Sequence, residues 1–368
     1  MIKTCHISTV HPLFDTRIFY KECKTLAEAG YNVTLIVQHD KEETIEGIHV
    51  VPLPRPQNRF QRMSNLVRYA FKLAVEQDAD IYHFHDPELI PIGLRLKKLG
   101  KKVIYDVHED VPRQILSKYY IPQIIRPTIA KLFEFYENRA SKHFDAIITA
   151  TPFINERFIK LGCNAININN FPLLSEFAMD DIDWSKKERA VCYVGGLDEI
   201  RGLNQMIEAI SKTDAKLILA GNFTTGEQKK RAMSLKGWQN VKYLGYADRE
   251  KVKEIFLRSM GGLVVLLPES NYVNSNYPTK MLEYMSAGLP VISSDFPLWK
   301  EVIEGNKCGI CVNPLNPEEI AEAIKYLVNN PEEAREMGKS GKRVVLEKYN
   351  WDKEKEKLLV LYRNILFR

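Results

Sequence analysis

One stretch decides the fold of this chain: Asn276-Tyr-Pro-Thr-Lys-Met-Leu-Glu-Tyr-Met-Ser-Ala-Gly-Leu-Pro-Val-Ile-Ser-Ser294. Met281, Leu282 and Met285 recur at helical spacing, which predicts a helix with one apolar face. Gly288 is the residue type that ends a helix, and the proline two residues later cannot extend it. The β-branched residues that follow predict a buried strand, so the stretch indicates a helix that leads into a parallel sheet.

The same alternation of helix and strand patterns runs outward from this stretch in both directions. Amphipathic helices are predicted, for instance, at 18–29, 61–76 and 203–210. The predicted strands are Thr4–Val10, Asn32–Val37, His49–Leu53, Asp80–Phe84, Lys102–Val107, Ala146–Ala150, Val191–Val194, Lys216–Ala220, Val241–Leu244, Leu263–Leu267 and Val291–Ser294. Such alternation is typical of parallel sheets covered on both faces, so we expect an α/β protein of two Rossmann-like, doubly wound domains facing a cleft. Neither first turn reads Gly-X-Gly-X-X-Gly, which argues against a nicotinamide or flavin enzyme.

An acidic, aperiodic stretch at 171–188 interrupts the alternation and predicts a linker. It separates a first domain at 1–170 from a second domain at 189–350, and 351–368 has the pattern of a charged amphipathic helix. A chain of 368 residues fits two domains of about 150 residues or more.

The composition excludes several classes of protein. Hydrophobic residues make up 45% and charged residues 27%, with a net charge of +5, which excludes a disordered or collagen-like chain. The six cysteines are scattered, and Cys308 and Cys311 have no second pair or nearby histidine, so we expect buried thiols rather than a zinc site. No signal peptide is visible and the longest apolar runs, such as 261–267, are too short to span a bilayer, so we expect a cytoplasmic location.

The helix that begins near Pro278 has the features of an anion site. Thr279 and Lys280 lie in its first turn, where free backbone N–H groups, the helix dipole and a lysine charge favour phosphate. Glu283 follows one turn later and could accept hydrogen bonds from a ribose diol. A surface Lys–Glu pair on an ordinary helix explains the same two residues.

A glycine turn opens the second domain, in the stretch Val191-Cys-Tyr-Val-Gly-Gly-Leu-Asp-Glu-Ile-Arg-Gly202. Gly195 and Gly196 follow a predicted strand and allow the backbone to approach a ligand closely. Arg201 precedes the next helix and could bind a diphosphate with its planar guanidinium. A simple turn with a solvated arginine is the alternative.

Histidines follow the predicted strands of the first domain. His108, after Ile104-Tyr-Asp-Val107, could bind a sugar hydroxyl or assist charge development, although a solvated loop histidine is the alternative. His83 and His85 alternate like metal ligands, but no third ligand has suitable spacing, so no metal is expected. In the first loop, Asp15 or Thr16 could cap the following helix, with Arg17 in its first turn.

Together these motifs resemble the retaining glycosyltransferases of family 4, which have the two-domain GT-B architecture. The matching stretches are His11-Pro-Leu-Phe-Asp-Thr-Arg-Ile18, Val107-His108, Gly195-Gly-Leu197 with Arg201-Gly202, Leu244-Gly-Tyr246 and Pro278 to Ile292. They cover nearly the whole chain in the family's order. The resemblance implies that the first domain binds the acceptor and the second the nucleotide sugar, and that the C-terminal helix crosses back to the first domain.

The resemblance also implies roles for individual residues. Glu283 would hold the nucleotide ribose, Tyr246 would lie in the base-binding loop, and His108 would lie near the transferred sugar. The implied site residues are His108, Arg201 and Lys280 for catalysis, Gly195, Gly196, Arg201, Tyr246, Pro278, Thr279, Lys280 and Glu283 for the donor, and His11, Asp15 and Arg17 for the acceptor. Two positions depart from the family pattern: Ser275 replaces its first glutamate, for which Glu269 or backbone N–H groups could substitute, and Gly196 replaces an arginine.

The expected reaction is therefore a retaining, metal-independent transfer of a hexose from a UDP- or GDP-linked sugar to a hydroxyl, without a cofactor. Arg201, Lys280 and a helix dipole would stabilise the leaving diphosphate electrostatically. The acceptor would be a glycan or a lipid-linked intermediate of cell-envelope or capsular polysaccharide. A nucleotide-sugar 2-epimerase and an inactive membrane-peripheral binding protein are the alternatives.

A basic and aromatic segment at 55–72 contains no acidic residue. Arg59, Arg62 and Arg68 alternate there with Phe60 and Tyr69, a pattern that suits the inner face of an anionic plasma membrane or an ordinary solvated helix. No nucleic-acid-binding fold accompanies the charge, so nucleic acid is not an expected partner.

Overall fold

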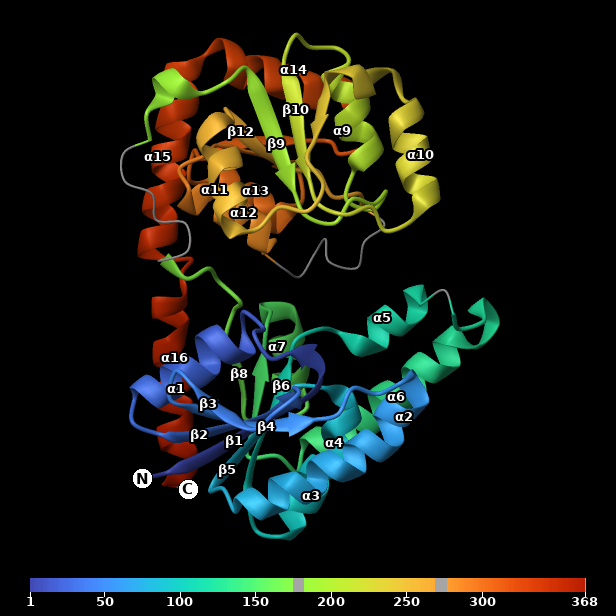
Figure 1. Cartoon of the computed structure of the whole chain (residues 1–368), viewed down its shortest axis with the longest axis vertical. Helices are drawn as coiled ribbons and strands as arrows, with labels where there is room; N and C mark the ends of the chain where they lie inside the picture. Colours follow the sequence, from blue (N-terminus) through green and yellow to red (C-terminus); the bar gives the residue numbers. More distant parts are fainter. Residues whose placement is uncertain (119, 175–181, 269–276, 368) are drawn as a thin grey trace. The chain divides into compact units, whose positions relative to one another are not determined.

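The computed structural model describes residues 1–118, 120–174, 182–268 and 277–367. The chain divides into two compact units, here named unit 1 (1–170 with 351–368) and unit 2 (171–350). The predicted linker thus falls in unit 2, and its residues 175–181 lie outside the described residues, as do Glu269 and Ser275. Each unit contains a parallel or mostly parallel sheet with flanking helices, which confirms the predicted fold class (Figure 1).

Unit 1 contains an eight-stranded sheet in the order β3-β4-β2-β1-β5-β6-β7-β8, parallel except for the β3–β4 hairpin. Its strands are β1 Lys3–Pro12, β2 Asn32–Gln38, β3 Glu43–Ile45, β4 Ile48–Leu53, β5 Ile81–Phe84, β6 Lys102–Val107, β7 Ala146–Thr149 and β8 Ala165–Asn167. Its helical segments are η1 Ile18–Cys23, α1 Lys24–Glu28, α2 Arg59–Gln61, η2 Arg62–Leu66, α3 Val67–Gln77, η3 Pro87–Leu89, α4 Ile90–Lys98, α5 Val111–Ser117, η4 Gln123–Ile125, α6 Arg126–Ser141, α7 Pro152–Lys160 and α16 Trp351–Leu366.

The two faces of the unit 1 sheet differ in chemistry. One face is apolar, with Cys5, Tyr82 and Tyr105 packed among buried residues of α3, α4 and α7. Side chains alternate along a strand, so His6, His83 and Asp106 point to the other face, and His6 lies opposite His83 in the β1–β5 register. Polar groups on that face must be paired within the protein, because they are fully buried.

The C-terminal helix α16 belongs to unit 1. Trp351 Nε1 donates to Thr25 Oγ1 at 2.9 Å, and Glu354 accepts from the backbone N–H of Asn169 at 2.9 Å. Tyr362 is buried, and its hydroxyl lies 3.1 Å from His6 Nε2 and 2.9 Å from His83 Nδ1. The last helix of the chain therefore supports the polar face of the first sheet.

Unit 2 contains a six-stranded parallel sheet in the order β11-β10-β9-β12-β13-β14. Its strands are β9 Ala190–Val194, β10 Lys216–Ala220, β11 Val241–Tyr243, β12 Gly261–Val264, β13 Val291–Ser294 and β14 Gly309–Val312. Its helical segments are η5 Trp184–Lys186, α9 Leu203–Ile210, α10 Gly226–Ser234, η6 Lys236–Asn240, α11 Arg249–Arg258, α12 Thr279–Ser286, α13 Pro297–Ile303, α14 Pro317–Asn329 and α15 Pro331–Glu347. Each predicted strand of both units is present with small shifts at its ends.

The helix and strand of the opening stretch form as predicted. Pro278 caps α12, and Gly288 has φ +68°, a conformation that glycine adopts without strain at a helix end. Met281, Leu282 and Met285 are buried in the core of unit 2.

Three short strands were not predicted, namely β3, β8 and β14. The first pairs with β4 through a tight turn at Glu46 and Gly47, both with positive φ, and is only three residues long. The last is formed by residues around Cys308 and Cys311, whose thiols are free and have pKa values raised by burial, as a core position requires. Among the described helices, none has the length and apolarity to cross a membrane.

Candidate functional site

The sheets place ligand sites at the point where the strand order reverses. In unit 1 that point lies between β1 and β5, and in unit 2 between β9 and β12. In open parallel sheets, loops at the carboxyl ends of the two strands on either side of this point form the binding crevice. Of the predicted site residues, His11 lies near the end of β1 and Gly195 follows β9, so each unit carries its own candidate site.

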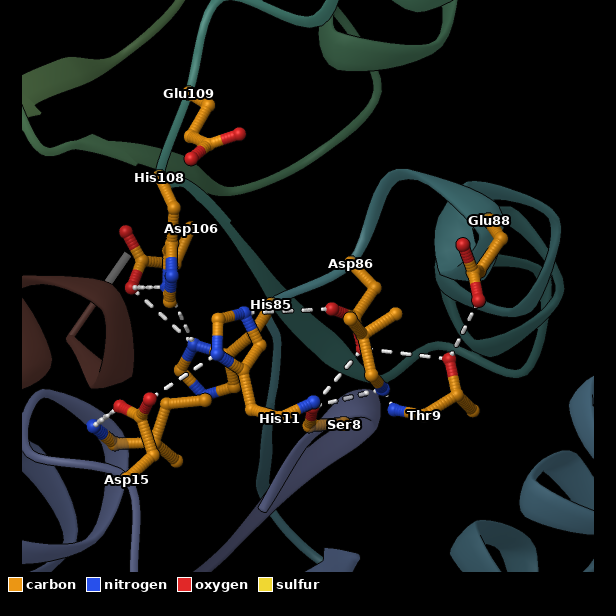
Figure 2. A network of polar contacts seen from close by, with 12 residues as sticks. Ser8, Thr9, His11, Asp15, His85, Asp86, Glu88, Asp106, His108 and Glu109 are labelled. Atoms are coloured by element: carbon orange, nitrogen blue, oxygen red, sulfur yellow. Dashed lines mark hydrogen bonds and ion pairs between the residues drawn. The ribbon is translucent and has the colours of Figure 1, made fainter. Parts of the chain in front are cut away.

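In unit 1, polar side chains gather where β1, β5 and β6 end (Figure 2). Asp86 fixes the end of β1: its Oδ2 accepts from Thr9 N at 2.6 Å and from Ser8 Oγ at 3.0 Å. His11 lies near the end of β1, and its Nδ1 is 3.1 Å from Asp15 Oδ2. Burial lowers the pKa of His11, but the hydrogen bond to Asp15 and the nearby carboxylates outweigh it and raise the pKa overall.

His108 contacts the buried carboxylate of Asp106. Its Nε2 lies 2.8 Å from Asp106 Oδ2 and 3.2 Å from His85 Nδ1. The rings of His108 and His11 have centroids 4.8 Å apart, and both side chains are partly exposed. Figure 2 shows this pair beside Asp15 and Asp86. Two partly exposed imidazole rings therefore lie next to the buried carboxylates of Asp86 and Asp106.

Arg17 neutralises the buried carboxylate of Asp106. Its Nε and Nη2 donate to the two oxygens of Asp106 at 3.0 and 2.9 Å, and its Nη1 donates to the Ile168 carbonyl at 2.9 Å. Burial would raise the pKa of Asp106, but the charges of Arg17 and His108 hold it well below the usual range. The Arg17 side chain is 3% exposed, so the expected contact with an acceptor is corrected here: Arg17 lies beneath the site and positions Asp106.

Asp15 performs the capping role that the sequence predicted. Its Oδ1 accepts from the backbone N–H groups of Arg17 and Ile18, both at 2.9 Å. Burial alone would raise its pKa, and the hydrogen bonds from His11 and Ile18 lower it below the usual range. Asp15 is therefore an ionised partner for His11.

Two groups among the described residues have a composition that suits a metal ion: His6, Glu22, His83 and His85, and also His85, Asp106 and His108. No metal was expected because His83 and His85 lacked a third ligand in the sequence, and the tertiary structure brings His6 and Glu22 to them. As they stand, His6 Nδ1 and His85 Nε2 lie at hydrogen-bond distance, 3.0 Å, and Arg17 Nε lies 3.0 Å from Glu22. A fixed guanidinium beside the carboxylate opposes a second cation at that place.

In unit 2, the glycine turn after β9 packs against two cations. Gly195 has φ +145°, and a Cβ there would lie 2.1 Å from Lys280 Cε. A Cβ on Gly196 would lie 2.8 Å from Arg201 Nη1. A side chain at either position would push the end of the lysine or the arginine aside, and the φ of Gly195 favours glycine in addition.

Lys280 lies half-buried at the start of α12, and none of the described carboxylates forms an ion pair with it. Burial lowers its pKa, Glu283 opposes that shift, and Arg201 and Arg249 add to it. Arg201 is held by Asp198, whose Oδ2 lies 3.2 Å from its Nε. This concentration of positive charge beside a glycine turn suits a diphosphate.

The remaining predicted donor residues surround these cations to different degrees. Glu283 contacts Arg249 Nη1 at 3.5 Å, an arginine that the sequence did not single out. Thr279 is exposed in the first turn of α12. Tyr246 follows the positive-φ Gly245 and is 76% exposed, so its ring is free of core packing and accessible to a planar ligand.

Sequence reasoning missed Asp86, Asp106 and the role of His85, whose Nδ1 lies 3.2 Å from both Asp106 Oδ2 and His108 Nε2. A signal was present: Asp106 is a charged residue inside the apolar run Ile104-Tyr-Asp-Val107, and a fully buried carboxylate needs a partner. The partner, Arg17, lies far away in the sequence and cannot be assigned from it.

Two family models match this chain. "Glycosyltransferase Family 4" matches residues 16–169 and "Glycosyl transferases group 1" matches residues 175–344. An uncharacterised glycosyltransferase of Methanocaldococcus jannaschii is 25% identical, with 93% of each chain covered. The phosphatidyl-myo-inositol mannosyltransferase of Mycolicibacterium smegmatis is 21% identical, with 93% of this chain and 88% of the relative covered.

Solved structures agree on the fold. The Anabaena protein HepE, determined in complex with UDP and glucose, superposes with a TM-score of 0.74 at 14% identity and covers 99% of this chain and 100% of its own. Together with the two family models, this places the chain among the family 4 glycosyltransferases with GT-B architecture.

Proposed function

We propose that this glycosyltransferase transfers a hexose from a UDP- or GDP-linked sugar to a hydroxyl of a glycan or lipid-linked acceptor, with retention of anomeric configuration. The setting proposed is the assembly of cell-envelope or capsular polysaccharide on the cytoplasmic side of the membrane. Support comes from the similar mannosyltransferase, whose name specifies a phosphatidylinositol acceptor, and from the similar Anabaena protein that binds UDP and glucose.

One observation carries the proposal: Lys280, without a carboxylate partner among the described residues, lies across Gly195 while Arg201 lies across Gly196. A half-buried ammonium beside a guanidinium raises the electrostatic free energy of the protein unless an anion binds between them. A nucleotide diphosphate supplies that anion, and its negative charge grows as the bond to the sugar breaks. The two cations therefore stabilise the transition state more than the bound donor, which lowers the barrier.

Retention follows if the leaving phosphate accepts the proton of the incoming hydroxyl on the same face of the sugar. The described carboxylates near the cations are already engaged, Asp198 with Arg201 and Glu283 with Arg249. They are thus held for positioning and for the ribose rather than presented as nucleophiles.

In unit 1, His108 and His11 supply hydrogen-bonding groups for sugar hydroxyls. Asp106 binds His108 through Nε2, which leaves Nδ1 as the other hydrogen-bonding atom of the ring. Asp15 keeps His11 oriented in the same way. We assign acceptor and sugar binding to this pair, with Asp106 and Arg17 as positioning residues.

A donor screen tests the proposal directly. UDP- and GDP-linked hexoses are each tested for thermal stabilisation of the chain, and any that bind are then supplied with glycan or lipid-linked hydroxyl acceptors. We expect one donor to raise the melting temperature and to give a product whose anomeric configuration, read by NMR, matches the donor. Consumption of donor into an epimer without an acceptor would indicate the epimerase instead, and binding without any turnover would indicate an inactive binding protein.

Metal independence is tested by chelation. Transfer measured with EDTA should equal transfer measured with added Mg²⁺ or Mn²⁺, because fixed cations replace the metal at the diphosphate. Loss of activity with EDTA that is restored by a metal would contradict this and direct attention to the two histidine groups of unit 1.

A further inference from the structure

Unit 1 exposes large apolar side chains on the helices α5 and α6 and the segment between them. Ile124 in η4 is 89% exposed, and Leu132 and Phe135 on α6 are 65% and 68% exposed. Leu116 and Tyr120, just before them in the chain, are also exposed. Single exposed apolar residues are common, but a group of this kind marks a surface that binds something.

The exposed side of α6 is both apolar and basic. Lys131, Leu132, Phe135 and Arg139 recur at spacings of three and four and are all exposed, so they share one helix face. Lys142 continues that side beyond the end of the helix.

The acidic residues of α6 point away from this side. Glu137 is fully buried and accepts from Arg157 Nη2 at 2.6 Å. Glu134 is paired with Arg113 and lies 3.9 Å from Arg157. The exposed side of α6 therefore presents cations that no carboxylate of the same helix neutralises.

Helix α2 extends the surface. The Arg59 guanidinium lies over the Tyr120 ring, 4.3 Å from its centroid, which joins α2 to the segment between α5 and α6. Phe60 is 82% exposed and Met63 55% exposed. We name this surface the α2–α6 face and define it by Arg59, Phe60, Met63, Leu116, Tyr120, Ile124, Ile125, Lys131, Leu132, Phe135 and Arg139.

We infer that the α2–α6 face docks on a membrane that contains anionic lipids. Apolar rings at the acyl boundary with lysine and arginine at the phosphates are the arrangement by which a helix lies in a membrane interface. A second copy of the chain fits less well, because a twofold contact would bring the same cations together. The inference rests on the proposed function in one respect: a lipid-linked acceptor requires the enzyme at a membrane.

The experiment measures binding to vesicles without donor or acceptor, so it does not depend on activity. Vesicles of phosphatidylcholine alone are compared with vesicles that also contain phosphatidylglycerol, at low and high salt. We expect the chain to sediment with the anionic vesicles at low salt and to be released by salt. Each cation removed, in Lys131→Gln or Arg139→Gln, should weaken binding about fivefold.

The double variant Leu132→Ser with Phe135→Ser should weaken binding at least about tenfold at every salt concentration, because apolar insertion is not screened. Leu315→Ser, a comparably exposed leucine in unit 2 (57%), is the matched control and should bind like the unaltered chain. Transfer to a water-soluble acceptor should be equal in all variants, so failure of docking and failure of the enzymatic proposal are distinguished. The inference is overturned if anionic vesicles do not bind the chain, if the double variant binds normally, or if the double variant only converts a dimer into a monomer.

Discussion

The two candidate sites use charge in opposite ways. In unit 1, Arg17, Asp106 and Glu22 are fully or almost fully buried, and Arg17 pairs with both carboxylates, whereas His11, Asp15 and His108 are partly exposed. In unit 2, Lys280 and Arg201 are partly exposed beside two glycines, and Lys280 has no ion-pair partner among the described residues.

The difference separates positioning from binding. A buried network whose charges balance is rigid, and breaking one of its pairs costs much free energy of folding. Such a network suits residues that orient two histidines. A cation such as Lys280, which has no ion-pair partner among the described residues, contributes little to the fold but binds an anion strongly. Substitutions of the paired charges in unit 1 should therefore mainly lower the free energy of unfolding. Substitutions of the two cations in unit 2 should mainly lower the catalytic rate.

The largest effect is expected for Asp106→Asn, which leaves the buried Arg17 with a weaker set of partners. The free energy of unfolding, measured with denaturant, should fall by about 3–5 kcal/mol. Asp78→Asn, which breaks an exposed pair with Lys101, is the control and should change it by less than about 1 kcal/mol. Recovery of part of the loss in the double variant Arg17→Met with Asp106→Leu would support the cause, and a loss equal to that of the control would contradict it.

Lys280→Ala and Arg201→Ala should each lower kcat by about 10²–10³, because each removes a charge from the leaving diphosphate. Their melting temperatures should stay close to that of the unaltered enzyme, which is the contrast with Asp106→Asn. Lys300→Ala, an exposed lysine paired with Glu304, is the control and should keep full activity. Transfer at the normal rate by both variants would remove the diphosphate role.

Acidification should destabilise unit 1 through its buried histidines. Burial lowers the pKa of His6 and His83 well below 6.5 and that of His85 to about 4, so the unfolded chain binds protons first. The stability is complete above about pH 6.5 and is lost as the pH falls towards about 4, by about 2 kcal/mol per histidine between about pH 7 and pH 5.

Glu22 acts in the opposite direction, because burial and the charge of Asp106 raise its pKa and favour proton uptake in the folded state. In Glu22→Gln the loss of stability on acidification should therefore be steeper than in the unaltered chain. The free energy of unfolding measured across this pH range checks both statements, and a flat profile in the unaltered chain would contradict the first.

The smallest effect is expected for Glu283→Gln, which should weaken binding of the free nucleotide about tenfold, or about 1.4 kcal/mol, through a weaker hydrogen bond to the ribose. Calorimetric titration with UDP or GDP measures it. Glu304→Gln, directly after the end of α13, serves as the control. An unchanged dissociation constant for Glu283→Gln would show that this carboxylate binds Arg249 only.

The fold of this chain follows closely from its sequence pattern. Strands such as 102–107 and helices such as 203–210 have the predicted bounds, because alternating apolar runs and amphipathic periods are local signals. The three-residue strands β3 and β8 were missed for the same reason, since they are too short to show a period.

The residues of the two candidate sites were predicted less completely than the fold. Gly195, Gly196, Arg201 and Lys280 were singled out because a strand-end glycine turn and a helix start are recognisable locally, and the structure brings them together. Their role at a donor stays a prediction. Arg17 was assigned to the acceptor, and the structure buries it beside Asp106. For the segment 55–72 the sequence left a membrane surface and an ordinary solvated helix open, and the structure adds the exposed apolar side chains of α6.

The sequence by itself determined two α/β units, most of their strands, and the glycine turn with Arg201, because each depends on residues that are close in the chain. Only the tertiary structure decided which charges are paired. Arg17 meets Asp106, and Tyr362 meets His6 and His83, through contacts between elements far apart in sequence. The physical reason is that burial makes such pairing obligatory without fixing the partner, which depends on how the helices and strands pack.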